Sequence, residues 1–479
     1  MFHRLRLAPK LVSKLASPLT VGGLICALAT PTQAGLLAPG PLMATLTGAE
    51  GYAYGYPLVL MAETLAGMTG PTRACGFEGG VNDFFHVFNI PGPDFRAVVR
   101  PNVDTLYSSA FLDLSKGPQL LDMPAVPGRY VLMALLDAWS NNFAGLGTPS
   151  HGEQAGHYMI AGPGWTGATP AGYTRVDAPT NLVWIIGRTE VRDADDVATV
   201  NAIQRQYTLS PLSGVRLPPD TSPCITRDES GTPPAIVNRL PAVDYFSRLS
   251  TLIAQNPPPA ADEPMLRKLA TIGVGPYATR TVSDMPARTQ LGLEWGKSMA
   301  QTTARLGLKL MGKTAPWTPD PSKIPLGDYG QQYMVRYVVA QIGFGANRND
   351  LAVYQNAIQD GQRKALNGAN QSYTITFPAG QLPPVDAFWS ITVYDEDGYL
   401  VANDLHRHAL NSFNKLHTNP DGSLTLHLSH QAPTGAATAA PISNWLPIPA
   451  GPFEATVRLY GPKAPVLDGS WTMPPIQPE

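Results

Sequence analysis

The residues best suited to chemistry lie in one short stretch, residues 100–107, which reads Arg-Pro-Asn-Val-Asp-Thr-Leu-Tyr. It holds a guanidinium, an amide, a carboxylate and two hydroxyl groups, in a chain of which only 15% is charged. Polar groups this dense are costly to bury unless they pair with one another or with a ligand. Asp104 could act as a general base or orient one, and Tyr107 could donate a proton or stabilise an oxyanion if its pKa is lowered. We place Asn102 in the same catalytic group and assign Thr105 to substrate binding.

A purely structural reading of this stretch stays open. If it forms a strand, Asp104 and Tyr107 point to opposite faces of the sheet. Asp104 could then belong to an Asx-turn that closes a tight loop, paired with Arg100 or Arg129. In that case the stretch would be internal scaffolding that joins strands.

Three further candidates lie elsewhere in the chain. Asp137 and Trp139 follow the apolar run 130–136, at the end of an expected core strand, where ligand pockets are common. We assign Asp137 to the catalytic group and Trp139 to substrate binding, against the alternative of a polar turn that caps the strand. His86 lies among phenylalanines and is a substrate-binding candidate, although a hydrogen-bonded core histidine would look the same.

No established cofactor or metal motif occurs in the chain. It contains no GxSxG, P-loop, HExxH or dinucleotide-binding fingerprint. His406 and His408 would share one face of a strand, but no carboxylate follows at ligand spacing, so we assign no metal ligand. The sequence indicates no particular cofactor. Cys75 and Cys224 could form one disulfide or remain separate buried thiols.

The elements that must position these residues are two β-rich parts on either side of a helical middle. Short apolar runs between Gly and Pro residues predict strands at 129–136, 156–161, 182–187, 373–377, 387–394, 423–428 and 453–460. Apolar residues at helical spacing predict helices at 42–68, 245–255, 263–272, 285–308 and 329–342, and one capped by Asp193. Asp397-Gly398 and Asp421-Gly422 are hairpin signals, and 211–234 is a proline-rich connection.

Length, charge and the N-terminus limit the classes of function. A chain of 479 residues is too long for a single core. The net charge of −2 gives no basic surface for nucleic acid. Residues 1–34 combine a basic leader, a short apolar run and Thr32-Gln33-Ala34, which is typical of a signal peptide cleaved before Gly35. We therefore expect a periplasmic or secreted protein with no stable membrane span.

Several strings in order resemble a known family. Residues 100–107, Gly128-Arg129-Tyr130, Asp137-Ala138-Trp139 and 162–165 are similar to the DUF1254 domain, and 387–394, 444–447 and 458–460 are similar to its usual companion, DUF1214. The resemblance implies an α+β fold with a β-sandwich-like N-terminal module and helices, a helical middle and a C-terminal jelly-roll-like β-sandwich. We divide the chain into 1–34 (signal peptide), 35–235 (DUF1254-like), 236–368 (helical connection) and 369–479 (DUF1214-like).

The same resemblance brings residues from both domains into one hypothesis. It implies Trp389 and Arg458 as substrate-binding groups contributed by the C-terminal domain to a pocket between the domains. The family has no settled activity, so the hypothesis comes from the residues: an exported hydrolase acting on a small or oligomeric polar substrate. The alternative is a non-catalytic periplasmic ligand-binding or envelope-associated protein. A homo-oligomer is compatible with either.

Overall fold

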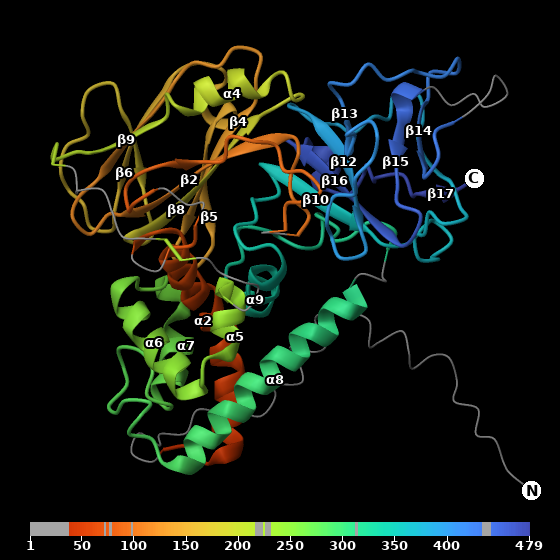
Figure 1. The fold of residues 1–479 in the computed structure, drawn as a ribbon. Helices are drawn as coiled ribbons and strands as arrows, with labels where there is room; N and C mark the ends of the chain where they lie inside the picture. Colours follow the sequence, from red (N-terminus) through yellow and green to blue (C-terminus); the bar gives the residue numbers. More distant parts are fainter. Residues whose placement is uncertain are drawn as a thin grey trace, which may run out of the picture.

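The computed structural model describes residues 38–70, 73–75, 79–96, 99–215, 224–225, 231–311, 315–433 and 442–479. The expected signal peptide, 1–34, lies outside these ranges. Two β-sheet modules lie beside each other, and a group of helices extends from the N-terminal one (Figure 1). The predicted α+β class with a helical middle is confirmed.

The N-terminal module is a pair of sheets that share one apolar core. The strand orders are β1-β2-β8-β4-β5 and β7-β6-β3-β9. Every residue of β4 is buried, and Leu112, Met133, Ile160 and Ile185 belong to the core that joins the two sheets. The strands are β1 (Phe85–His86), β2 (Thr105–Asp113), β3 (Gln119–Met123), β4 (Val131–Asp137), β5 (Asn142–Gly147), β6 (Gly156–Ala161), β7 (Thr174–Asp177), β8 (Leu182–Glu190) and β9 (Thr208–Pro211).

The C-terminal module is a second two-sheet sandwich. Its strand orders are β10-β16-β12-β13 and β15-β14-β11-β17, and apolar side chains such as Ile375, Ile391 and Leu426 fill the space between the sheets. The strands are β10 (Ala352–Ala357), β11 (Tyr373–Phe377), β12 (Trp389–Asp395), β13 (Ala409–Asn411), β14 (Leu424–Ser429), β15 (Trp445–Pro447), β16 (Phe453–Tyr460) and β17 (Gln477–Pro478).

The helices form a layer with its own core, to which the N-terminal helix contributes many residues. They are α2 (Pro41–Met68), α5 (Pro233–Arg239), α6 (Ala242–Gln255), α7 (Glu263–Ala270), α8 (Ala287–Met311) and α9 (Tyr333–Ile342). The short helices elsewhere are α3 (Thr148–His151), α4 (Val197–Gln204) and α10 (Ala464–Leu467), with 3-10 turns η4 (Ala260–Asp262) and η5 (Ile442–Asn444). None of the helices in the described ranges has the length and apolar character needed to cross a membrane.

Glycines set the close contact between α2 and α8. A Cβ atom added at Gly296 would lie 2.4 Å from the carbonyl oxygen of Thr45, and one at Gly292 would lie 2.5 Å from that of Pro41. Only glycine allows two helix backbones to approach this closely. Figure 1 shows α8 starting beside the end of α2 that lies farthest from the sheets and rising obliquely from there.

Most predicted elements are confirmed, with several local differences. Helix α5 begins inside the expected proline-rich connection, since Pro is well tolerated in the first turn of a helix. Asp193 does not cap α4: its carboxylate accepts from the backbone N–H of Asp196, the actual N-cap residue. The Asp421-Gly422 turn is not a hairpin, because it connects β13 and β14 of different sheets.

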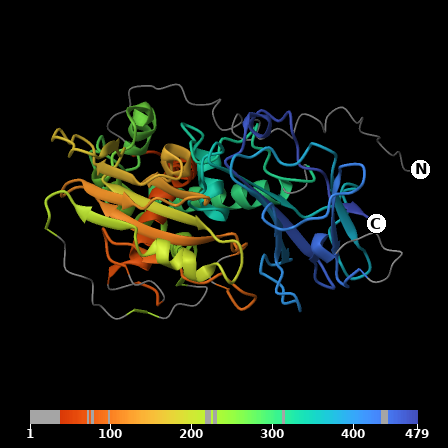
Figure 2. The same ribbon diagram turned by 90° about the horizontal axis from the view of Figure 1, so that it is seen from above.

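The two sandwiches meet at an interface that contains both apolar side chains and polar hydrogen bonds. Figure 2 shows the two modules from above. Tyr130 and Trp184 of the N-terminal module belong to one apolar cluster with Leu351, Phe388 and Tyr460 of the C-terminal module. The rings of Phe388 and Tyr460 stack with 4.2 Å between centroids. The 100–107 stretch lies at this interface, where it contacts β12, β13 and β16.

Candidate functional site

The first part of the stretch fastens the two modules together. Arg100 forms an ion pair with Glu454, with 2.6 Å between Nε and Oε1. Its backbone N–H donates to the Gly398 carbonyl at 2.7 Å, and the Tyr394 hydroxyl donates to the Pro101 carbonyl at 2.8 Å. This half of the stretch therefore acts as an interdomain clamp.

Asp104 lies at the centre of the clamp and is 1% exposed. It accepts from the Ser390 hydroxyl at 2.5 Å and from the Asn411 amide at 3.3 Å, both in the C-terminal module. Burial raises the pKa of Asp104, while the Arg458 guanidinium and the two hydrogen bonds act in the opposite direction. A carboxylate this enclosed can orient its neighbours, but no substrate atom can reach it in this arrangement.

The turn expected at this point is present, with different partners. Asn102, rather than Asp104, closes it by accepting the backbone N–H of Asp104 at 2.8 Å. The predicted pairing of Asp104 with Arg100 or Arg129 is wrong, because Arg100 pairs with Glu454 and Arg129 pairs with Asp196.

Asn102 also holds the start of β2. Its amide donates to the Thr105 hydroxyl at 2.9 Å and to the Tyr460 hydroxyl at 2.7 Å. Thr105 is 1% exposed, so its hydroxyl serves this internal network.

Tyr107 differs from these residues because part of its surface remains exposed. It is paired in register with Arg188 on the antiparallel neighbour β8, and the Arg188 guanidinium lies 5.2 Å from the centre of its ring. Burial alone would raise the pKa of Tyr107, but Arg188, the Asn102 amide and Arg458 together lower it below its ordinary value. A lowered pKa makes the phenol a better candidate for proton transfer than an ordinary tyrosine side chain.

Arg188 is the functional candidate that sequence reasoning missed. It is 7% exposed and donates to the Asn347 side-chain oxygen at 3.2 Å, and the Asn347 amide donates to the Tyr354 hydroxyl at 2.8 Å. The sequence offered one indication of this role, which is that Arg188 is a single cation directly after the apolar run 182–187. An arginine is rarely buried without a specific role for its charge.

Arg458 provides the second buried cation. It donates to the Thr392 hydroxyl at 2.8 Å, to the Tyr394 hydroxyl at 2.7 Å and to the Arg100 carbonyl at 3.0 Å. These three bonds hold it against the clamp, where its charge acts on both Asp104 and Tyr107.

The side chain of Trp389 lies on the face of β12 opposite to that of its neighbour Ser390. Strand alternation turns its ring into the core of the C-terminal sandwich, 5.5 Å from the ring of Phe377, while Ser390 points to Asp104. It is 4% exposed and lies apart from the Tyr107 ring.

Asp137 and Trp139 lie where β4 ends against the helices. Asp137 accepts the backbone N–H groups of Trp139 and Asn141, both at 2.9 Å, so it closes a polar turn. Trp139 is 0% exposed, and its indole donates to the Asn256 carbonyl at 3.1 Å. The structure does not bring this pair together with Tyr107.

His86 belongs to the edge strand β1, where it pairs with Ser108 of β2. Its side chain therefore lies on the face of the sheet opposite to that of Tyr107. Its Nδ1 is 2.9 Å from the Ser108 hydroxyl, and its ring lies between those of Phe84 and Phe88. Burial lowers the pKa of His86. The surroundings are those of a hydrogen-bonded aromatic cluster.

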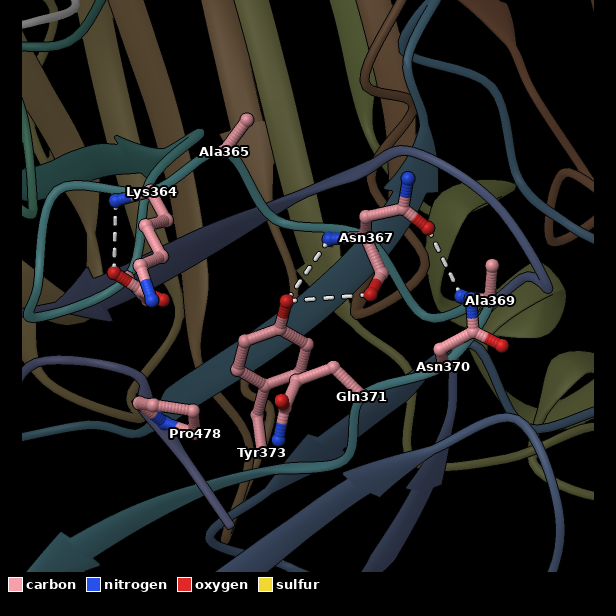
Figure 3. A pocket seen from close by; sticks show the side chains of 9 residues that line it. Lys364, Ala365, Asn367, Ala369, Asn370, Gln371, Tyr373 and Pro478 are labelled. Carbon is pink, nitrogen blue, oxygen red and sulfur yellow. Dashed lines mark hydrogen bonds between the residues drawn. The ribbon is translucent and has the colours of Figure 1, made fainter.

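Two surface cavities lie elsewhere. One, of about 290 Å³, is lined by residues at the edge of the C-terminal sandwich, and Figure 3 shows the Tyr373 hydroxyl between the backbone groups of Asn367 there. The other, of about 510 Å³, lies between α6, α7 and Tyr277. Neither touches Asp104 or Tyr107. Within the described ranges, no cluster of three or more His, Cys, Asp or Glu residues could hold a metal ion.

Comparison with known proteins identifies both modules. The model of "Protein of unknown function (DUF1254)" matches residues 81–211, and that of "Protein of unknown function (DUF1214)" matches residues 351–464. No curated protein of known function matches the chain.

Among solved structures, the VPA0106 protein from Vibrio parahaemolyticus is similar in fold. It has a TM-score of 0.69 at 22% identity, and the alignment covers 91% of this chain and 100% of that one. An uncharacterised protein from Burkholderia cenocepacia aligns over 96% of this chain and 93% of its own, with 13% identity and a TM-score of 0.41, too low to bear on the fold. With both domain models matched in order, the chain belongs to the two-domain DUF1254/DUF1214 family.

Proposed function

We propose that this protein is an exported hydrolase for a small polar substrate, with its reacting group at the junction of the two domains. The observation that carries the proposal is the position of the Tyr107 phenol beside the buried cation Arg188. The lowered pKa of Tyr107 supports a role in proton transfer.

Hydrolysis needs one group that takes a proton from water and returns it to the leaving group. The Tyr107 phenolate would accept a proton from a water molecule, whose oxygen adds to the carbonyl carbon of the substrate. The phenol would then give that proton to the departing oxygen or nitrogen as its bond to the carbonyl carbon breaks. Tyr107 ends as it began, so a single residue with a suitable pKa is sufficient.

In this proposal Asp104 is a positioning residue. It keeps Ser390, Asn411 and Arg458 in place, and these groups fix the second domain against the strand that carries Tyr107. Asn102 contributes directly, because its amide lies between the Tyr460 hydroxyl and Tyr107.

A second candidate function is a non-catalytic binding protein. The observation that favours it is the complete involvement of Asn102 and Asp104 in bonds between the domains. In that case the buried network would only set the relative position of the two sandwiches, and Tyr107 would be part of a ligand contact.

Turnover by the mature protein separates the two candidates. We would screen ester, amide and glycoside substrates with and without added divalent cations, and then compare Tyr107→Phe with the wild type. Loss of the phenol hydroxyl should lower kcat by roughly 10²–10⁴-fold. Tyr277→Phe, at an exposed ring on the helical layer, is the matched control and should be silent. Turnover that is unchanged in Tyr107→Phe would refute the catalytic role.

Export is supported by the disulfide between Cys75 and Cys224, whose Cα atoms lie 4.9 Å apart. Disulfides of this kind persist mainly in oxidising compartments. Peptide mapping of the protein from its native cells, before and after reduction, should find this bond and an N-terminus at Gly35. A reduced, cytoplasmic protein that retains residues 1–34 would contradict export.

A further inference from the structure

The cavity at the edge of the C-terminal sandwich contains polar groups that the fold itself does not use. It has a volume of about 290 Å³ and shares no residue with the Tyr107 site. Figure 3 shows the side chains around it, which come from residues 360–373 and from Pro478 in β17. The volume is at the small end of the range for ligand pockets, so the cavity has room for one small ring.

Asp360 is the more deeply buried of the two charged residues in this cavity. It is 2% exposed, and its Oδ1 accepts the backbone N–H groups of Gln362 at 2.8 Å and Lys364 at 2.9 Å, which closes the turn. Its Oδ2 has no protein partner in the described ranges and is not enclosed by protein, so it faces the cavity. A carboxylate oxygen in this position favours a ligand that donates a hydrogen bond.

Three side chains on the rim add further groups that can bind a ligand. The amide nitrogen of Gln371 donates to the carbonyls of Ser372 and Glu479, both at 2.8 Å, which leaves its side-chain oxygen unused. Within the described part of the chain, Asn370 uses neither atom of its side-chain amide, and Lys364 forms no ion pair. The rim therefore offers hydrogen-bond donors and acceptors side by side.

Apolar surface lies next to these polar groups. Tyr373 is 3% exposed, and its hydroxyl is occupied by the backbone N–H and carbonyl of Asn367, at 3.0 and 3.2 Å. Its contribution to the cavity is therefore mainly ring carbon. Pro478, its partner across the β11–β17 pair, adds a second ring, and Ala365 and Ala369 add methyl groups.

From this combination we infer that the cavity binds a neutral sugar residue. A sugar ring carries hydroxyl groups, which both donate and accept hydrogen bonds, on an apolar C–H frame. The mixed groups of the rim suit the hydroxyls, and the rings of Tyr373 and Pro478 suit the C–H frame. An anionic ligand would be repelled by Asp360 and a cationic one by Lys364, so a neutral ligand fits best. The inference goes beyond the proposed hydrolysis and does not depend on it.

Titration with simple sugars tests the inference. We would add glucose, galactose, mannose and N-acetylglucosamine to the full mature protein and follow binding by calorimetry and by saturation-transfer NMR. At least one should bind saturably, in the millimolar range expected of so small a ligand. The uronic acid and the amino sugar with the same ring should bind more weakly. No saturable binding of a neutral sugar, or tighter binding of a charged one, would overturn the inference.

A tetrasaccharide of the sugar that binds best distinguishes two sources of the ligand. It should bind as well as the free sugar if the cavity takes the end of a glycan, and more weakly if it takes only a free ring.

Three variants locate the binding. Asn370→Ala removes an exposed amide that the fold does not use, and should weaken sugar binding by about 3–10-fold. Ala369→Leu fills the cavity from an exposed position and should remove binding. Gln362→Ala removes an exposed amide from the same loop that does not line the cavity, and should bind sugar as the wild type does. Thermal unfolding at unchanged temperature would show that all three variants are folded.

The outcome is separable from that of the proposed function. Tyr107→Phe leaves the cavity intact, so it should bind the sugar as the wild type does even when turnover is lost. Sugar binding that persists in both Asn370→Ala and Ala369→Leu would refute the site, whatever Tyr107→Phe does to turnover. Turnover that survives in Tyr107→Phe would refute the hydrolase role and leave the sugar site standing.

Discussion

At the scale of single residues, the pKa of the Tyr107 phenol depends on charged and polar groups from four parts of the fold. Arg188 faces it from β8, Arg458 and Tyr460 from β16, Tyr354 from β10, and Asn102 from the turn before β2. The two cations favour the phenolate, whereas burial and the neighbouring hydroxyls oppose it. Since the cations prevail, the pKa of Tyr107 lies below the ordinary value of about 10.

This balance predicts a pH dependence of turnover. If the Tyr107 phenolate is the base, kcat/KM rises with pH through the pKa of Tyr107 and levels off below pH 10. Arg188→Gln removes the largest lowering influence, so the inflection should move to higher pH by about 1 unit or more. The measurement is a pH profile of kcat/KM on both proteins, with Arg175→Gln as the charge control. An inflection that stays in place in Arg188→Gln would show that Tyr107 is not the titrating group.

The residue scale also shows the limits of prediction from the sequence. The high density of polar groups in the 100–107 stretch indicated that these groups need hydrogen-bond partners when they are buried. Those partners could not be identified from the sequence, since Ser390 and Asn411 come from more than 200 residues away and no pattern pairs them with Asp104. Arg188 was missed for the same reason: one residue in a strand has no pattern of its own.

At the scale of elements, local patterns predicted the long helices and several core strands, but not short strands such as β3, β9 and β13. Strand β11 and strand β16 were predicted with their observed bounds, because alternating or continuous apolar runs and β-branched residues act locally. Trp389 and Ser390 show where such reasoning ends. Alternation guarantees that they face opposite sides of the sheet, but only the tertiary fold decides which side meets the other domain.

The α2–α8 contact gives a prediction at this scale. Gly296→Ala would place a methyl group 2.4 Å from the Thr45 carbonyl oxygen, so the helices must separate. We expect the free energy of unfolding to fall by about 1–3 kcal/mol, the usual cost of overpacking. Gly307→Ala in the same helix is the matched control, because nothing lies within 4 Å of its added Cβ.

The two glycine variants should change stability in opposite directions. At Gly307 the alanine should stabilise the protein by roughly 0.4–1 kcal/mol through the helix propensity of alanine and lower entropy of the unfolded chain. Chemical denaturation of both variants measures the two free energies. Equal effects at the two positions would mean that the α2–α8 approach does not limit stability.

At the scale of the whole molecule, the two sandwiches are joined by direct side-chain contacts as well as by the connecting chain. One apolar cluster includes Trp184 from the first and Phe388 and Tyr460 from the second, and the clamp around Asp104 adds buried polar bonds at the same interface. Domains joined only by a linker are expected to move independently, whereas a large apolar interface opposes this. The protein should therefore behave as one cooperative unit.

Unfolding experiments test whether the two sandwiches unfold together and whether Asp104 couples them. In the wild type, denaturation followed by tryptophan fluorescence and by far-UV circular dichroism should give coincident transitions. Asp104→Ala leaves the buried donors of Ser390 and Asn411 without their acceptor, at a cost of about 1–3 kcal/mol each. Because these bonds cross the interface, the loss should fall on domain coupling and separate the two transitions. Asp177→Ala, at an exposed ion pair, should leave them coincident. If Asp104→Ala instead shifts one undivided transition, the carboxylate supports a single domain and the clamp does not couple the two.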